Sequence, residues 1–88
     1  MQNNNCDIMC IKKRFGAAII QLRKERGLSQ ERFAIEAGID RRYMSDIENG
    51  RRNVSLDIIE RISSNLKLPL SELFRVVEQI KVDGENSK

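Results

Sequence analysis

The sequence predicts an all-α fold, a compact domain of five helices. Apolar residues recur every three or four positions along most of the chain, which is the spacing of the buried face of an α-helix. Serine and aspartate residues that can cap a helix N-terminus precede several of these segments. The 88 residues are 40% hydrophobic and include one proline, so the chain has enough apolar surface for a small helical core and little that would interrupt its helices.

The first helix is expected to begin at about residue 8 or 11 and to end near Arg26. The preceding segment, residues 1–7, is polar and shows no periodicity, so we expect a disordered tail there. Basic residues near the end of the helix suit the negative end of its dipole, and Gly27 is expected to stop it. The apolar stripe of this helix consists of Ile11, Phe15, Ala18, Ile19 and Leu22.

The second and third helices, about residues 30–37 and 41–49, form the central unit of the chain. Ser29 and Asp40 are suitable N-caps, and Gly38 stands where the turn between the helices needs a positive φ. Two short helices joined by a tight turn in this way are typical of a DNA-binding helix-turn-helix. The apolar residues of the unit are Phe33, Ala37, Ile39, Met44 and Ile47.

A fourth and a fifth helix are expected after the loop that follows the central unit. Ser55 should cap the fourth helix, and Pro69 should end it, because the residue before a proline avoids the α region. Ser71 should cap the fifth helix, which is expected to end at about residue 81 or 82, ahead of a second disordered tail, residues 83–88. The buried stripe predicted for the fourth helix consists of Leu56, Ile59, Ile62 and Leu66.

The central unit and its flanks resemble the helix-turn-helix of phage-repressor-like (XRE-family) transcriptional regulators. The resemblance covers roughly residues 11–75. It implies a phage-repressor-like DNA-binding domain over residues 8–82, with the helix-turn-helix in helices two and three and a dimerisation helix at the C-terminal end. The flanking residues that carry the resemblance are Arg14-Phe15-Gly16, Leu22-Arg23, Gly27-Leu28-Ser29-Gln30 and Arg52-Asn53-Val54-Ser55-Leu56.

The compact layout looks most like the small controller proteins of restriction–modification systems. The third helix begins Asp40-Arg41-Arg42-Tyr43, and Arg52-Asn53 follows it, as in those proteins. They dimerise and bind inverted repeats upstream of the genes they regulate. Small phage repressors and antitoxin-type regulators share nearly all of these features. The resemblance therefore implies a sequence-specific transcriptional regulator that binds double-stranded DNA, its operator, as a homodimer.

The resemblance also implies structural roles for three residues. Arg23 is expected to pair with Glu48 and so to tie the first helix to the third, the recognition helix. Gly16 lies inside the first helix, where glycine costs about 1 kcal/mol relative to alanine. Because the family often has glycine at this position, we expect close packing of the helices there.

The basic residues are concentrated in the first part of the chain. Eleven lysines and arginines against six acidic residues lie between Lys12 and Arg52, whereas the rest of the chain has five against seven. This distribution suggests a face that meets DNA phosphates. A solvated helix surface would give the same imbalance, so charge alone does not decide the function.

Side chains at the start of the third helix are expected to reach base edges in the major groove. Arginine suits guanine, because it can bond O6 and N7 together. Two roles are open to Asp46: it could accept from a cytosine amino group, or orient Arg42 across one helical turn. Tyr43 could contact a phosphate, a thymine methyl group or only its neighbours. The predicted base-contacting residues are Arg41, Arg42, Tyr43, Ser45 and Asp46.

A second group of residues is expected to bind phosphates. Gln30 opens the second helix, whose N-terminal N–H groups would point at a phosphate. In the family this glutamine also braces the recognition helix. Arg51, Arg52 and Asn53 lie in the following loop and are expected to position the protein on the DNA backbone. Arg14 and Lys13 are weaker candidates, since a simply solvated side chain explains each of them better.

The fifth helix carries more apolar surface than one small core needs, which indicates a partner surface. A wide core stripe would explain the same residues. Because related small regulators dimerise through this region, we expect a symmetric homodimer. The predicted interface residues are Leu73, Val76, Val77 and Ile80.

The composition argues against several other functions. The chain has no histidine, and Cys6 and Cys10 are expected to be reduced thiols, so we predict no enzyme activity, no metal site and no cofactor. No apolar run approaches the ~20 residues that span a bilayer, so we expect a cytoplasmic protein without membrane contact, and no small-molecule ligand is evident. The alternative function is an antitoxin-type or other protein-interaction module on the same fold, although the arginine-rich start of the third helix favours DNA.

Overall fold

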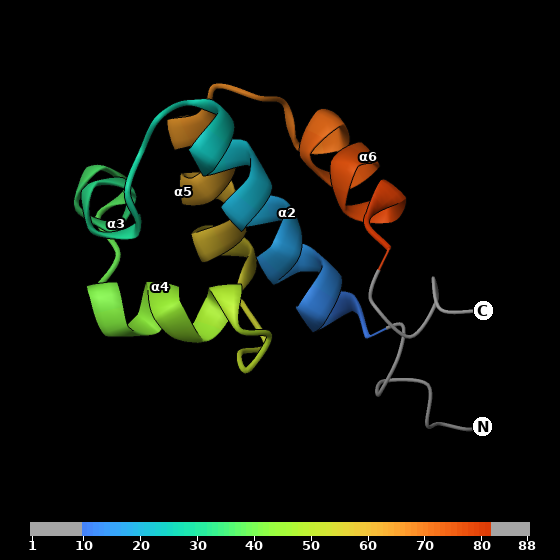
Figure 1. Cartoon of the computed structure of the whole chain (residues 1–88), viewed down its shortest axis with the longest axis horizontal. Helices are drawn as coiled ribbons and strands as arrows, with labels where there is room; N and C mark the ends of the chain where they lie inside the picture. The colour runs from blue at the N-terminus through green and yellow to red at the C-terminus, as the bar shows by residue number, and fades with distance from the viewer. Residues whose placement is uncertain (1–9, 82–88) are drawn as a thin grey trace.

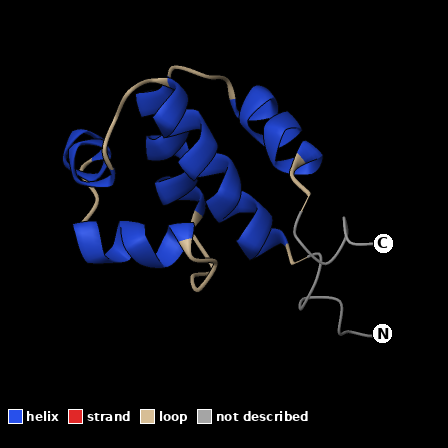
Figure 2. Cartoon of the chain, in the orientation of Figure 1, coloured by secondary structure: helices blue, strands red, loops and turns tan. Residues whose placement is uncertain are grey.

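The computed structural model describes residues 10–81, and within them the chain forms five α-helices and no strand (Figure 2). The all-α prediction is therefore confirmed. The two predicted tails, residues 1–7 and 83–88, lie outside the described residues. The helices are α2 (Ile11–Glu25), α3 (Gln30–Ala37), α4 (Arg41–Glu48), α5 (Leu56–Leu66) and α6 (Leu70–Gln79).

Helix α2 crosses the middle of the domain and packs against both α4 and α6 (Figure 1). Helices α3 and α4 pack against each other as the two halves of the helix-turn-helix, and α5 packs against α3 and lies behind α2 in the view of Figure 1. Helix α6 lies on the side of α2 that faces away from the helix-turn-helix. The recognition helix is therefore supported by α2 and α3, while α6 remains at the edge of the domain.

Side-chain caps begin three of the helices, as the sequence predicts. The Ser29 hydroxyl accepts from the Arg32 N–H at 3.0 Å, and the Asp40 carboxylate accepts from the Arg42 N–H at 3.0 Å. The Ser55 hydroxyl caps α5 in the same manner. Each cap satisfies an N–H group that has no partner within its helix. These caps begin α3, α4 and α5 at the residues that the sequence predicts.

The junction between α5 and α6 differs from the prediction. Helix α5 ends because Lys67 adopts a left-handed conformation with φ 60°, two residues before Pro69. Ser71 does not cap α6, because Pro69 itself occupies the N-cap position, and its carbonyl accepts from the Leu73 N–H at 3.0 Å. Proline is well suited to the start of a helix, since its φ is already fixed and its missing N–H is not needed there. Helix α6 also ends at Gln79, before the predicted end.

The core is formed by one buried face from each helix. Ile62 and Leu66 are fully buried, as expected for α5, and Ile59 is half-buried. The prediction for Leu56 is wrong: this side chain is 83% exposed. Leu56 is the first residue of α5, and the packing that buries the rest of the stripe does not extend to this end of the helix. The fully buried larger side chains are Phe33, Ile19, Met44, Ile47, Ile62, Leu66, Leu73 and Val77.

Gly16 allows the backbones of α2 and α4 to touch. A Cβ atom at this position would lie 2.4 Å from the carbonyl oxygen of Ile47 and 2.6 Å from that of Glu48. Such distances are far below van der Waals contact, so the two helices could not keep this separation with any other residue here. The close packing expected at Gly16 is confirmed.

No helix among residues 10–81 combines the length and the apolar character that a membrane span requires.

Replacing Gly16 with alanine should destabilise the protein, even though alanine favours a helix by about 1 kcal/mol over glycine. The new methyl group would meet two backbone carbonyls, which cannot turn aside as a flexible side chain does. We expect a net loss of about 1–3 kcal/mol in the free energy of unfolding, measured by urea denaturation.

Gly27→Ala is the matched control for this prediction. A Cβ at Gly27 would meet nothing within 4 Å, so only the φ of 70° opposes the substitution, at a cost of about 1–2 kcal/mol. The propensity gain is absent at this position, because Gly27 lies outside α2. If Gly16→Ala were as stable as the wild type, the contact between α2 and α4 would not constrain the fold.

Candidate nucleic-acid interface

A buried ion pair fixes the recognition helix α4 to α2. Arg23 donates from Nε to Glu48 Oε2 at 2.7 Å and from Nη2 to Oε1 at 3.0 Å. The two side chains are only 11% and 3% exposed. Hydrogen bonding to Glu48 raises the pKa of Arg23, so the arginine keeps its charge. The pairing expected from the family resemblance is confirmed.

Gln30 joins the same carboxylate to α3. Its side-chain Nε2 donates to Glu48 Oε1 at 2.9 Å, so the expectation that it braces the recognition helix is confirmed. Arg23 also donates to the backbone carbonyl of Leu28, at 3.0 Å, in the segment before α3. The carboxylate of Glu48 is thus the point at which α2, α3 and α4 are held together.

The opposite face of α4 carries the predicted base-contacting residues. Arg41 and Arg42 are exposed, and Ser45 is half-buried on the same side of the helix. Together with Gln30 and Asp40 they line a hollow of about 630 Å³ at the starts of α3 and α4. The structure therefore brings four of the predicted DNA-contacting residues to one surface: Gln30, Arg41, Arg42 and Ser45.

The remaining predicted residues form a second cluster where α4 meets the following loop. Asp46 forms ion pairs with Arg51 at 3.5 Å and with Arg52 at 3.4 Å, and none with Arg42. The hypothesis that Asp46 orients Arg42 is therefore wrong. The guanidinium carbon of Arg52 also lies 4.6 Å from the centre of the Tyr43 ring, within the range of a cation–π contact.

The start of α2 lies against this loop. A Cβ at Gly50 would be 2.8 Å from Cγ of Lys13 and 3.0 Å from its Cα, so the two segments are in direct contact. Lys13, Arg51, Arg52 and Asn53 are all exposed. Lys13 therefore joins the loop arginines in one basic area. Lys13 is only a weak candidate for phosphate binding from the sequence, because the spacing of these residues does not indicate that α2 touches the turn after α4.

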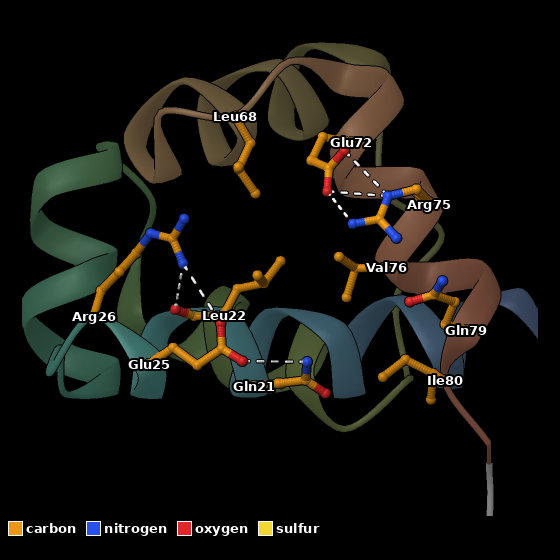
Figure 3. Close-up of a pocket in the computed structure, with 10 residues that line it drawn as sticks. All are labelled: Gln21, Leu22, Glu25, Arg26, Leu68, Glu72, Arg75, Val76, Gln79 and Ile80. Atoms are coloured by element: carbon orange, nitrogen blue, oxygen red, sulfur yellow. Dashed lines mark hydrogen bonds and ion pairs between the residues drawn. The ribbon is translucent and has the colours of Figure 1, made fainter.

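The predicted dimer interface on α6 is only partly accessible. Leu73 and Val77 are 0% exposed, because their side chains fill the core between α6 and its neighbours, so these two cannot present a surface to a partner. Val76 and Ile80 are half-buried and point into a groove of about 460 Å³ between α2 and α6 (Figure 3).

The polar side chains around this groove bind one another. Arg75 donates to Glu72, which lowers the pKa of that carboxyl group. Gln21 donates to Glu25 at 3.4 Å, and Arg26 donates to the backbone carbonyl of Leu22 at 3.0 Å (Figure 3).

An exposed apolar area lies on another side of the domain. Two adjoining hollows share Ile59 and Phe74 as lining residues, and the second of them also reaches Arg52 and Asn53 in the basic loop. Sequence reasoning missed this area because it placed Leu56 in the core. We call it the apolar strip, and its residues are Ile11, Val54, Leu56, Ile59, Leu70 and Phe74.

Comparison with known proteins agrees with this geometry. The helix-turn-helix family profile matches residues 19–73, from the middle of α2 into α6. The chain is 54% identical over 70 residues to the control protein C.MunI from Mycoplasma sp, an alignment that covers 78% of this chain and 95% of that protein. It is 45% identical over 64 residues to the control protein C.BamHI from Bacillus amyloliquefaciens, with 72% and 79% of the two chains covered.

A solved structure shows the same arrangement of helices. The restriction-modification controller protein C.AhdI from Aeromonas hydrophila superposes with a TM-score of 0.68 at 42% sequence identity. The superposition covers 70% of this chain and 94% of that one.

Removing Arg23 should unfold much of the protein, because Glu48 would then be a buried carboxylate without its cationic partner. We expect Arg23→Ala to lower the free energy of unfolding by about 3–5 kcal/mol in chemical denaturation, or to leave the variant unfolded. Arg32→Ala is the matched control, since it breaks an exposed pair with Glu36 at 3.6 Å and should cost no more than about 1 kcal/mol. Equal losses in the two variants would contradict the role assigned to Arg23.

Proposed function

The chain belongs to the helix-turn-helix family and is a DNA-binding transcriptional regulator, and from that premise we propose that it is the controller protein of a restriction–modification system. In this proposal it binds an inverted-repeat operator as a homodimer, with α4 in the major groove. The observation that carries the proposal is the pair of exposed arginines at the first two positions of α4, a helix whose inner face is held by Glu48. The restriction–modification setting is taken from the names of the relatives. We place the protein in the cytoplasm, where such a regulator meets its DNA.

Base recognition is assigned to the outer face of α4. Arg41 and Arg42 are free of ion pairs among the described residues, and each has a planar guanidinium that can bond guanine O6 and N7 together. Ser45 lies one turn further along the same face and can donate or accept. An α-helix with its side chains is about 10–12 Å across, which fits the major groove at a width of about 12 Å.

Phosphate binding is assigned to the basic area beside α4. Arg51, Arg52 and Asn53 follow the helix directly, and Lys13 approaches from α2. Contacts of this kind set the register of the helix on the duplex without reading the sequence. Gln30 donates one hydrogen bond to Glu48 and keeps its second amide N–H for a phosphate of the DNA backbone.

We assign the apolar strip as the surface that binds a second copy of this chain. The strip contains Leu56, whose side chain would otherwise remain largely in water, and it reaches the loop at Arg52. In a two-fold dimer in which each copy uses this strip, the two basic loops lie beside the shared interface. Such a dimer binds half-sites of inverted orientation about 34 Å apart, one turn of DNA.

Selection of bound duplexes from a random DNA pool at about 0.15 M salt tests this function. We expect enrichment of an inverted repeat with half-sites about one helical turn apart. Arg41→Ala and Arg42→Ala should each weaken binding to that site by about 1–3 kcal/mol and relax the selection at particular bases. Arg52→Ala should instead weaken binding to the selected site without relaxing the selection at any base, and should lower the salt slope there by about one.

The opposite result would change the assignment. If no motif were enriched and binding were weak and strongly salt-dependent, the chain would be an antitoxin-type or other protein-interaction module on this fold. Equal loss of affinity on every sequence after Arg41→Ala and Arg42→Ala would exclude direct base recognition by these two side chains.

The dimer can be tested separately from DNA binding. Leu56→Glu should convert the dimer to a monomer in analytical ultracentrifugation, because it places a charge in the proposed interface; it should leave the fold intact, because Leu56 is exposed in the monomer. Ile35→Glu is the matched control, since Ile35 is an exposed apolar residue on α3, outside the apolar strip. If Val76→Glu dissociated the dimer and Leu56→Glu did not, the interface would lie at the groove between α2 and α6.

A further inference from the structure

The Asp46 side chain binds the loop after α4, in addition to being a predicted DNA contact. Its carboxylate has one oxygen 3.5 Å from Nη1 of Arg51 and the other 3.4 Å from Nε of Arg52. Its backbone carbonyl also accepts from the Arg51 N–H at 2.9 Å. The Asp46 side chain is 25% exposed, whereas both arginines are well exposed. One acidic residue of the recognition helix therefore binds both arginines of the neighbouring loop.

Arg52 is held from two sides in this arrangement. The carboxylate of Asp46 binds its Nε, and the Tyr43 ring lies under its guanidinium at 4.6 Å. Both holding residues belong to α4, so the position of Arg52 depends on the recognition helix. In the DNA-free protein the loop arginines thus already have an anionic partner.

The same arginines are the ones proposed to bind phosphates. A phosphate that binds Arg51 or Arg52 must displace the Asp46 carboxylate or be held close to it, and two anions at that distance repel each other. Each exposed ion pair stabilises the DNA-free protein by at most about 1 kcal/mol. The free-energy cost of breaking the pairs is therefore small, but it opposes binding to DNA of any sequence. Released from the arginines, Asp46 can accept a hydrogen bond from a cytosine amino group, which only particular sequences offer at that place.

We propose that Asp46 is a specificity-determining residue that withholds Arg51 and Arg52 from the phosphates of non-cognate DNA. Cognate DNA compensates the lost ion pairs by its base contacts with α4, whereas other DNA does not. The carboxylate thereby lowers non-specific affinity more than specific affinity. This inference rests on the proposed DNA-binding function and deepens it by naming what limits non-specific binding.

Asp46→Asn tests the inference, because asparagine has nearly the same shape without the charge. Affinity for a duplex without the selected motif should rise by about three- to thirtyfold, as expected for two exposed ion pairs. The slope of log K against log salt should steepen by up to about 0.9 for each arginine released. The ratio of specific to non-specific affinity should fall. If Asp46 only stabilised the loop, the substitution Asp46→Asn would not steepen the salt slope.

Glu72→Gln is the matched control. It makes the same change in net charge and releases Arg75 from an exposed pair, but it lies on α6, away from α4 (Figures 1 and 3). A rise in non-specific affinity as large as that of Asp46→Asn would show a general charge effect and overturn the inference. The urea midpoint of both variants establishes that they are folded.

A double-mutant cycle separates the proposed route from simple repulsion between Asp46 and DNA. In the background Arg51→Ala, Arg52→Ala, the effect of Asp46→Asn on non-specific affinity should disappear, because the arginines that the acid withholds are gone. An undiminished effect in that background would mean that Asp46 repels phosphates directly, and the inference would fail. If the wild-type protein showed no preference for any sequence, the proposed function would fail instead, and the two failures are therefore distinguishable.

Discussion

The arrangement of the DNA-binding surface depends on the buried contact between Arg23 and Glu48. Helix α4 has eight residues, too few to be stable alone in water. It keeps its place because Glu48 binds α2 through Arg23 and α3 through Gln30, and because Gly16 lets α2 touch its backbone. A buried ion pair contributes little net stability compared with an apolar core, but it accepts only one geometry. That geometry sets the direction in which the outer face of α4 points.

The two faces of α4 are therefore held by different kinds of contact. The inner face is dry and tightly packed, with Met44 and Ile47 in the core beside Glu48. The outer face bears exposed ion pairs between Asp46 and the loop arginines, which water weakens and a phosphate can replace. A rigid inner face and an exchangeable outer face suit a helix that must keep its orientation while its side chains change partners on DNA.

The position of Arg41, Arg42 and Ser45 on one outer face of α4 could be predicted from the sequence, because the helical period alone places them there. The partners of Asp46 could not. Spacing within a helix suggested Arg42, four residues earlier, yet the chain turns after α4 and brings Arg51 and Arg52 nearer to the carboxylate. The contact depends on the path of a loop, which residue periodicity does not describe.

The sequence by itself determined the helices, the caps of α3, α4 and α5, and the helix-turn-helix, because these depend on hydrogen bonds and side-chain spacing within a few residues. Only the tertiary structure decided which apolar residues stay exposed. Leu56 shares the period of the buried stripe of α5 but lies beyond the packed part of that helix, whereas Leu73 and Val77 fill the core. Periodicity shows which residues share a face, but the neighbouring helices determine how much of that face is covered. The surface available to a second copy of the chain follows from that packing.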